Sequence, residues 1–445
     1  MKIAIIGNNV AGTFSAQNLR ILDKKVEIEI FSIESYPYYS RIKLPELISG
    51  KVSINDLIVF KDDWYKKNNI KYNLNKKVIR IDSKNKNFFI ENQPESFSYD
   101  KLILATGSMP NIPAIRNAQE MLKKGVFTLR NIDDVLEIRD YIKKHDVKKS
   151  VIIGGGLLGL ELAKQIKECD LDTTVVEFFP RLLPRQLDND CANMLKSEIE
   201  KMGITVILNA NTEEILGNDN VKGIKLKDGR DFDAEIILIQ AGISPTIDLA
   251  KEANLKTNRG IIVNEFLETS ESDIFAVGDC IEYKNQIWGI IPACMEQSKI
   301  VAASVLGEKN TEYKGTTPKN TLKIIGLDLT SIGVFDPSEE EGGGWEILRK
   351  ADKEKCCYQK IVLKDNKLKG AILFGDNKAL SFIYNNMEEN VNKTEMRKLL
   401  ELYIWVCSNC GTEYDEGLME NLFEKLPPDW KCPNCKALKE KFKKK

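Results

Sequence analysis

Histidine is nearly absent from this sequence, and cysteine is absent from its first 168 residues. Among 445 residues there is one histidine, His145, and the ten cysteines begin at Cys169. A single histidine excludes a histidine-rich metal site and disfavours a catalytic pair of histidine with serine or cysteine. Ten cysteines in a chain of this length are also too dilute for a small disulfide-stapled fold.

Net charge and long apolar runs are missing as well. The 65 basic and 66 acidic side chains leave a formal charge of −1, whereas binding to nucleic acid or to an anionic membrane needs a basic surplus. No run of about 18 apolar residues occurs, so no transmembrane helix is expected. Asn8 and Asn9 interrupt the apolar start of the chain, which favours a strand over a signal peptide. We expect a cytoplasmic protein of about three domains, with its cysteines reduced or bound to metal.

Two segments combine a short apolar strand, a glycine-rich turn and a helix. The first turn carries Gly7 and Gly12, with Asn9 in place of the middle glycine, and the second carries Gly154, Gly156 and Gly159. Glycines let the backbone approach a pyrophosphate closely, and the helix that follows points its N–H groups at the phosphate. Strands that alternate with helices predict parallel sheets. The sequence therefore predicts an α/β protein with two Rossmann-like dinucleotide-binding domains.

Each unit also has an acidic residue where a ribose would bind. Glu177 follows Gly159 by 18 residues, and Glu34 follows Gly12 by 22 residues. A carboxylate at this position favours the free 2′-hydroxyl of NADH over the 2′-phosphate of NADPH, although Arg181 is near enough to soften the preference. The first turn is the weaker match on its own, but asparagine tolerates the left-handed backbone that such a turn can need.

Four motifs in this order resemble the pyridine nucleotide–disulfide oxidoreductase superfamily over residues 1 to about 400. Besides the two turns, they are Ala-Thr-Gly-Ser-Met-Pro at 105–110 and Ile-Phe-Ala-Val-Gly-Asp at 274–279. The resemblance implies FAD on the first turn and NAD on the second. It places Thr106, Gly107, Gly278 and Asp279 at the FAD, Arg41, Glu46 and Glu296 beside the flavin, and Glu161 beside the nicotinamide.

Among these residues, Glu161 and Glu46 are the candidate catalytic ones. Two simpler interpretations stay open, namely Arg41 as a surface salt bridge and Glu296 as a solvated helix residue. The six cysteines from Cys169 to Cys357, among them Cys294 at the expected flavin border, are expected to have no redox role, and Cys169 and Cys191 are expected to be buried apolar residues.

The missing early cysteines gain meaning from this resemblance. Disulfide reductases of the superfamily carry two cysteines after the FAD loop, and related peroxidases keep one, but residues 44–50 read Leu-Pro-Glu-Leu-Ile-Ser-Gly. A reduced flavin would therefore have no thiol to receive its electrons. The stretches 40–50, 178–188 and 322–331 resemble NAD(P)H:rubredoxin oxidoreductases and the flavin module of assimilatory nitrite reductases.

Four cysteines lie near the C-terminus as two C-x-x-C pairs: Cys407, Cys410, Cys432 and Cys435. This spacing suits a tetrahedral sulfur site for iron or zinc. The surrounding Trp405, Tyr414, Trp430 and Phe442 resemble the aromatic core of a rubredoxin, which implies iron. A zinc ribbon and a pair of disulfides are the alternatives.

Two features depart from typical rubredoxins. The loop between the cysteine pairs is shorter, and Lys436 stands where a glycine usually follows the last cysteine. A module this short needs its metal to fold.

The predicted organisation has five parts. They are an FAD-binding domain (1–117 and 243–317), an NAD-binding domain (118–242), a small α+β domain (318–386), a linker (387–401) and a rubredoxin-like domain (402–445). The predicted function passes electrons from NADH through FAD to one iron held by the four C-terminal cysteines, and then to an external acceptor. By resemblance, that acceptor is a flavodiiron- or rubrerythrin-like protein that reduces oxygen, nitric oxide or peroxide in an anaerobe. The alternatives are the NADH-oxidising component of a nitrite reductase and a flavoprotein with a zinc-ribbon docking module.

Overall fold

The computed structural model describes two compact parts of the chain. The described residues are 1–317, 319–324, 326–337, 343–419 and 421–445, with the backbone alone for 319–324. Ile325, in the stretch 322–331 singled out above, lies outside the described residues. Unit 1 contains residues 1–148, 214–223 and 233–317, and unit 2 contains residues 149–213, 224–232 and 318–445.

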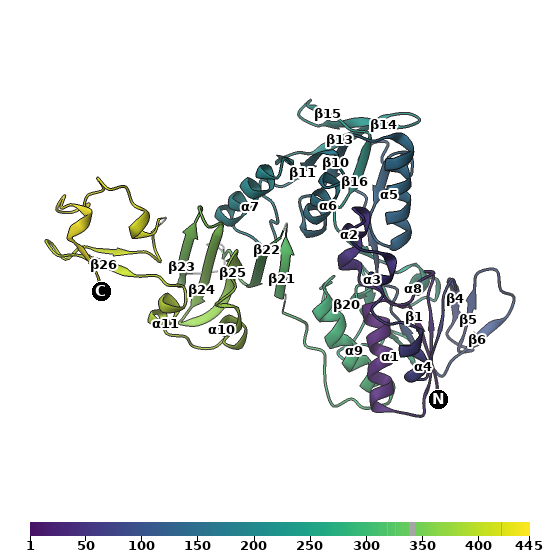
Figure 1. The fold of residues 1–445 in the computed structure, drawn as a ribbon. Helices are drawn as coiled ribbons and strands as arrows, with labels where there is room; N and C mark the ends of the chain where they lie inside the picture. The colour runs from purple at the N-terminus through teal and green to yellow at the C-terminus, as the bar shows by residue number, and fades with distance from the viewer. Residues whose placement is uncertain (318, 325, 338–342, 420) are drawn as a thin grey trace. The chain divides into compact units, whose positions relative to one another are not determined.

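Unit 1 is built on a parallel sheet with the strand order β19-β7-β1-β2-β3, of which Figure 1 labels β1. The strands are β1 (Lys2–Ile6), β2 (Glu27–Phe31), β3 (Ile70–Asn73), β7 (Lys101–Leu104) and β19 (Ile274–Ala276). Ile3 to Ile6 of β1 are all buried, as expected where both faces of a parallel sheet are covered. Helices α1 (Val10–Leu22) and α9 (Ile291–Val305) pack against each other.

Further helices and strands complete unit 1. The helices are α2 (Leu44–Ile48), α3 (Ile54–Leu57), α4 (Asp62–Lys67), α5 (Ile132–His145) and α8 (Asp248–Glu252). The strands are β4 (Val78–Asp82), β5 (Asn87–Ile90), β6 (Ser96–Ser98), β8 (Ser108–Pro110), β9 (Val126–Thr128), β16 (Ile236–Ile239), β17 (Ile243–Pro245), β18 (Ile261–Ile262) and β20 (Ile281–Glu282). Strands β13 (Thr212–Gly217), β14 (Val221–Leu226) and β15 (Asp231–Asp233) lie where the chain passes between the units.

Unit 2 begins with a second parallel arrangement. Strands β10 (Lys149–Ile153), β11 (Asp172–Val176) and β12 (Thr205–Ile207) pair in parallel. Helix α6 (Leu157–Lys167) follows β10, and α7 (Asn189–Lys201) precedes β12. Parallel strands joined by helices in both units confirm the predicted α/β class with Rossmann-like domains.

Unit 2 also contains an antiparallel sheet with the strand order β21-β22-β25-β24-β23. Its strands are β21 (Lys319–Ile324), β22 (Leu327–Gly333), β23 (Trp345–Asp352), β24 (Cys357–Lys364) and β25 (Lys367–Phe374). Helices α10 (Leu380–Asn385) and α11 (Lys393–Leu399) follow. Met396 and Leu400, in the segment expected to be a linker, are buried in the core of this sheet.

A small module ends the chain. Strands β26 (Ile404–Cys407), β27 (Glu413–Asp415) and β28 (Phe442–Lys444) form an antiparallel sheet. Phe423 stacks on Trp405 and contacts three further rings, Tyr414, Trp430 and Phe442. These aromatic side chains form its core together with buried Cys407 and Cys432.

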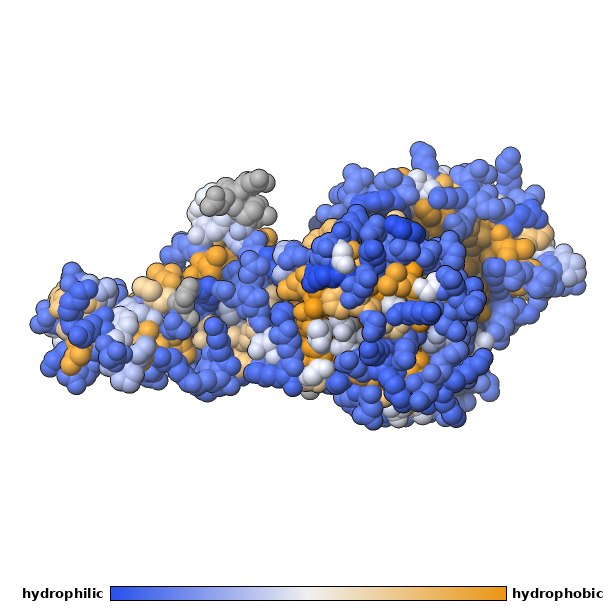
Figure 2. Space-filling model, turned by 90° about the horizontal axis from the view of Figure 1, so that it is seen from above, coloured by the Kyte–Doolittle hydropathy of each residue, from blue (hydrophilic) through white to orange (hydrophobic). Residues whose placement is uncertain are grey.

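The surface of the molecule is mainly polar on the face that Figure 2 shows, with apolar side chains in smaller patches. None of the helices within the described ranges is both long and apolar enough to span a membrane.

Candidate functional site

The first glycine turn packs directly on the end of β7. A Cβ atom on Gly7 would lie 2.0 Å from the Ala105 carbonyl oxygen, and one on Gly12 would lie 1.9 Å from the Gly7 carbonyl oxygen. Gly7 also has a φ of +119°. No side chain fits at either position, so both predicted glycines are needed for the approach of β1, α1 and β7.

Two asparagines hold the rest of this turn. The Asn9 amide donates to the Ala105 carbonyl at 3.1 Å, so Asn9 ties the turn to β7 where the pattern expects a glycine. Asn8 accepts hydrogen bonds from Thr13 and Tyr65, both at 3.0 Å. The buried Asn8 Nδ2 has no partner among the described residues. Because buried donors are nearly always paired, this free N–H group suits an acceptor such as a phosphate oxygen.

Glu34 lies in a network with Arg41. Its carboxylate accepts a hydrogen bond from the Tyr39 hydroxyl at 2.5 Å and an ion-pair contact from the Arg41 guanidinium. The Arg41 guanidinium also donates to the Arg130 carbonyl oxygen. With its side chain 27% exposed, Arg41 forms a partly buried pair rather than one on the open surface. The role of Glu34 at a ribose stays a prediction.

Asp279 is held by two groups that lie far from it in the sequence. Its Oδ2 accepts from the Ser108 hydroxyl at 2.8 Å and from the Arg130 guanidinium at 3.2 Å. Arg130 also donates to the Ser108 carbonyl at 3.0 Å. Burial and the neighbouring charge of Arg41 lower the pKa of Arg130. At neutral pH both guanidinium groups are nevertheless cationic, and each is paired with a carboxylate, Arg41 with Glu34 and Arg130 with Asp279.

Arg130 was missed by reasoning from the sequence. It follows β9 by two residues and precedes α5. A cation just after the carboxyl end of a parallel strand was the available signal, because ligands of α/β sheets bind at that edge. A Cβ atom on Gly107 would lie 3.1 Å from the Asn9 amide nitrogen and 3.8 Å from Arg130 Nη2. Gly107, one of the residues predicted to bind FAD, therefore lies next to both Asn9 and Arg130.

Helix α9 contacts the turn that follows β19 and the segment of residues 313–316. Gln297 accepts from the Gly278 N–H at 2.8 Å and donates to the Tyr313 hydroxyl at 3.0 Å. The exposed Glu296 accepts from the Thr316 hydroxyl at 2.5 Å. A Cβ atom on Gly278, whose φ is +92°, would lie 2.7 Å from the Ala11 Cβ. Gly278 therefore lets α1 pack closely against the turn that follows β19.

Three further residues of unit 1 named from the sequence are Thr106, Glu46 and Cys294. Thr106 donates its hydroxyl to the Thr246 carbonyl at 2.8 Å. Glu46 is half-buried on α2. The Cys294 sulfur lies 3.8 Å from Asp279 Oδ1, and burial raises the pKa of the Cys294 thiol well above its ordinary value. Cys294 is therefore a neutral buried thiol.

The second glycine turn is closed by Glu177. Its carboxylate accepts from the Gly155 N–H at 2.5 Å and from the Phe179 N–H at 2.9 Å, and the residue is 6% exposed. Gly155, which the motif leaves unspecified, has its own constraint, because a Cβ atom there would lie 2.6 Å from Leu182 Cδ2. Gly156 caps α6, and Gly159 is buried within it. Each Glu177 oxygen keeps a further lone pair for a ribose hydroxyl.

Two more charged residues flank this turn. Arg181 contacts Asp336 at 3.2 Å and Asn189 at 3.3 Å, so its guanidinium is engaged within unit 2. Glu161 lies half-buried on α6.

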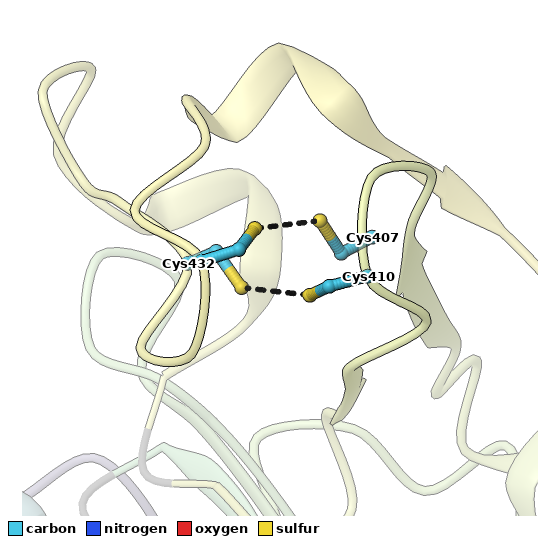
Figure 3. A group of neighbouring side chains, drawn as sticks. Cys407, Cys410 and Cys432 are labelled. Carbon is cyan, nitrogen blue, oxygen red and sulfur yellow. Dashed lines mark hydrogen bonds between the residues drawn. The ribbon is translucent and has the colours of Figure 1, made fainter.

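The four C-terminal cysteines converge on one point (Figure 3). The sulfur atoms of Cys407 and Cys435 are 3.7 Å apart, as are those of Cys410 and Cys432, and all four lie within 4.8 Å of one another. Tetrahedral metal–sulfur bonds of about 2.3 Å imply sulfur–sulfur distances of about 3.8 Å. The four thiols therefore fit a single iron or zinc ion.

The Cys410 thiol has a lowered pKa, whereas burial raises the pKa of the Cys407 thiol. Hydrogen bonds from the hydroxyl and the backbone of Thr412 lower the pKa of the Cys410 thiol to about 6. The thiolate is the form that binds metals. Cys410 is exposed, whereas Cys407 and Cys432 are buried.

Comparisons with known proteins agree with this arrangement. Residues 1–298 match the model of the pyridine nucleotide-disulphide oxidoreductases, and residues 318–391 match the C-terminal domain of rubredoxin NAD+ reductases. A nitrite reductase (NAD(P)H) of Bacillus subtilis is 35% identical over 89% of this chain and 48% of its own length. An NADH-rubredoxin oxidoreductase of Clostridium acetobutylicum is 32% identical over 84% of this chain and 91% of its own.

Solved structures show the same likeness. The crystal structure of NADH:rubredoxin oxidoreductase from Clostridium acetobutylicum is 29% identical, has a TM-score of 0.68, and covers 88% of this chain and 95% of its own. This chain spans about half the length of the Bacillus subtilis relatives it matches, at 48% for each of two. The chain belongs to the pyridine nucleotide–disulphide oxidoreductase family.

Proposed function

We propose that this protein oxidises NADH and passes the electrons through FAD to a single iron ion in its own C-terminal module. The observation that supports this most directly is the geometry of the four thiols, with sulfur pairs at 3.7 Å. They occur in one chain with two dinucleotide turns of an oxidoreductase family. A relative is named NADH-rubredoxin oxidoreductase, and the present chain carries a rubredoxin-like module of its own.

FAD would be held in unit 1. The Gly7 and Gly12 turn and the free Asn8 amide suit its pyrophosphate, and Arg41 and Arg130 supply two cations. The Ser108–Asp279 pair would bind hydroxyl groups of the same ligand. When bound, FAD supplies chemistry that accepts two electrons as a hydride and releases them singly.

NADH is favoured over NADPH by the residues around the second turn. The buried carboxylate of Glu177 would repel a 2′-phosphate. Arg181 is the nearby cation that could offset this effect, and its guanidinium is engaged by Asp336 and Asn189. The chain's own contribution is therefore to bind, orient and select the nucleotide, since hydride transfer needs no proton from a side chain. Under this proposal Glu161 lies beside the nicotinamide ring and Glu46 beside the flavin ring.

Iron is favoured over zinc because the aromatic core around the thiols resembles that of a rubredoxin. Each NADH supplies two electrons, so the one iron ion would be reduced twice in succession, with the external acceptor reoxidising it in between, and NAD+ and one proton would be released. The exposed Cys410 gives the centre an edge toward solvent, and an external acceptor of the flavodiiron or rubrerythrin kind would take the electrons there. None of the ten cysteines forms a disulfide, and thiols stay reduced in a reducing compartment, so we propose a cytoplasmic location.

A second candidate is the NADH-oxidising part of a nitrite reductase, which the 35% identity to the Bacillus subtilis enzyme favours. A third is a flavoprotein whose zinc ribbon only docks a partner. Metal content and the visible spectrum separate the third from the first, because a zinc site is colourless.

An anaerobic titration with NADH tests the proposal. In the wild type, the ferric absorbance should disappear at or before the point where the flavin absorbance bleaches, because the flavin passes its electrons to the iron. Cys407→Ser should lose the iron spectrum and keep flavin reduction, while Cys169→Ser, outside the cluster, should behave as the wild type. A ferric centre that stays oxidised beside fully reduced flavin would rule out the relay.

A further inference from the structure

The loop after Glu177 joins the dinucleotide turn to the start of α7. At one end, Leu183 N–H donates to the Gly155 carbonyl at 3.3 Å, so the loop lies on the glycine turn. At the other end, Asp188 caps α7 and accepts from the Cys191 N–H at 3.0 Å. A nucleotide that contacts Glu177 therefore acts on the same loop that places the first turn of α7.

That first turn of α7 is bound to the antiparallel sheet of unit 2. Asp188 accepts from the Tyr358 hydroxyl at 2.6 Å and pairs with Lys360 at 2.8 Å. Lys360 and Asp188 are 5% and 6% exposed, so this pair is buried. Next to it, Asp190 pairs with the guanidinium of Arg349 on β23 at 2.5 Å. These groups line a cavity of about 430 Å³.

The backbone of Arg349 makes a second connection. Its N–H donates to the Gly417 carbonyl at 3.0 Å, and Gly417 belongs to the loop of the C-terminal module that follows β27. A Cβ atom on Gly417 would lie 3.0 Å from Leu348 Cδ2, so the loop approaches β23 closely. Leu402, at the start of the module, is buried in the core of the sheet.

Ion pairs secure the same contact. Arg397 pairs with Asp415 at 2.5 Å through side chains that are 18% and 15% exposed, and Lys425 contacts Glu354. The module makes these contacts through residue 402, residues 415–417 and residue 425. Its metal-binding thiols belong to two other turns. The module is thus seated on β23, on the turn that follows β23 and on α11 by a surface other than its metal turns.

We propose that Arg349 is a positioning residue that couples the NADH-binding segment to the iron module. Its guanidinium holds α7 at Asp190, and its backbone N–H holds the module at Gly417. A change in the loop after Glu177 therefore reaches the module through the Arg349 side chain and peptide, while the buried Asp188 contacts with Tyr358 and Lys360 hold the same turn of α7 on the neighbouring strand β24. This inference rests on the proposed binding of NADH at Glu177.

Hydrogen–deuterium exchange of the full-length, flavin-loaded protein tests the coupling, with NAD+ as the probe. In the wild type, saturating NAD+ should slow exchange about threefold or more in segments 151–179, 345–352 and 413–419. In Asp190→Arg, slowing should persist in 151–179 and be lost in the other two segments. Arg349→Asp should show the same loss, and the double variant, in which the charges are exchanged, should restore it.

A matched control uses another pair on α7. Exchanging the charges of Lys196 and Glu200, which pair at 2.6 Å on the exposed side, should leave all three segments unchanged. If Arg349→Asp fails to fold, Asp190→Arg decides the test, because the Asp190 side chain is 55% exposed. Two results would overturn the coupling. In the first, NAD+ still slows hydrogen exchange of residues 345–352 in Asp190→Arg. In the second, NAD+ slows exchange of residues 151–179 in the wild type but leaves exchange of residues 345–352 unchanged. If NAD+ does not protect 151–179, the nucleotide site itself is wrong.

Discussion

Gly411 and Lys436 occupy equivalent positions in the two cysteine turns. Each follows the second cysteine of its pair and has a left-handed backbone, with φ of +76° and +62°. Each donates its N–H to the carbonyl of the first cysteine, at 2.8 Å for Gly411 to Cys407 and 3.0 Å for Lys436 to Cys432. The two turns therefore share one geometry, although only one of them has the residue that adopts it without strain.

Replacing Lys436 with glycine should stabilise the metal-loaded module. A left-handed backbone costs a side-chain-bearing residue about 1 kcal/mol, and the greater freedom of glycine in the unfolded chain offsets part of that gain. We expect Lys436→Gly to raise the free energy of unfolding by about 0.5 kcal/mol, measured by denaturant titration of tryptophan fluorescence. Gly411→Ala should lower it. Destabilisation by Lys436→Gly would contradict this account.

Removal of the Glu416 carboxylate should destabilise the same module. This buried group accepts from Tyr403 N–H at 2.8 Å, Trp405 Nε1 at 3.0 Å and Phe423 N–H at 2.9 Å. Glu416→Ala leaves three donors unpaired, and we expect a loss of about 3 kcal/mol in metal-loaded protein. The exposed Glu413, which pairs with Lys445, is the control, because its truncation should cost less than about 0.5 kcal/mol. Similar losses for the two variants would refute the prediction.

Substitution of Gly12 should abolish the FAD site. A methyl group there would lie 1.9 Å from the Gly7 carbonyl oxygen, so α1 must move away from β1. We expect Gly12→Ala to be purified with little or no flavin, judged from the visible absorbance. Gly343, whose Cβ would meet nothing within 4 Å, supplies the control, and Gly343→Ala should retain full flavin content. Normal flavin content in Gly12→Ala would mean that the turn tolerates displacement.

Release of Arg181 should shift the nucleotide preference. Asp336 contacts the Arg181 guanidinium at 3.2 Å, and its replacement by asparagine removes a charge that holds it. We expect Asp336→Asn to raise kcat/KM for NADPH by about fivefold, with little change for NADH. The gain should vanish in the double variant Asp336→Asn/Arg181→Ala. An unchanged NADPH value would show that Arg181 does not reach the ribose.

Local sequence patterns were sufficient to predict several parts of this protein. Gly7, Gly12 and the Gly154 turn were predictable because strand, turn and helix are contiguous and backbone sterics demand glycine. The four thiols were predictable because two residues between cysteines place both sulfurs on one side of a turn. The absence of any cysteine before Cys169 likewise showed, with no structure at all, that the segment directly after the first glycine turn carries no thiol.

Other contacts were decided by tertiary structure. Arg130 reaches Asp279 across 149 positions, and Lys360 reaches Asp188 across 172. Nothing in the sequence near either residue selects its partner, because each pair forms only after strands and helices have packed. The buried Met396 and Leu400 show the same point, since a charged, helix-compatible segment carries no local sign that a sheet will cover it.

The sequence alone determined which chemistry the chain can hold, through short motifs whose geometry is set by neighbouring residues. Only the tertiary structure decided which charges are paired and where the C-terminal module is seated. Burial and ion pairing depend on groups that are distant in the chain and close in space, so no local pattern records them.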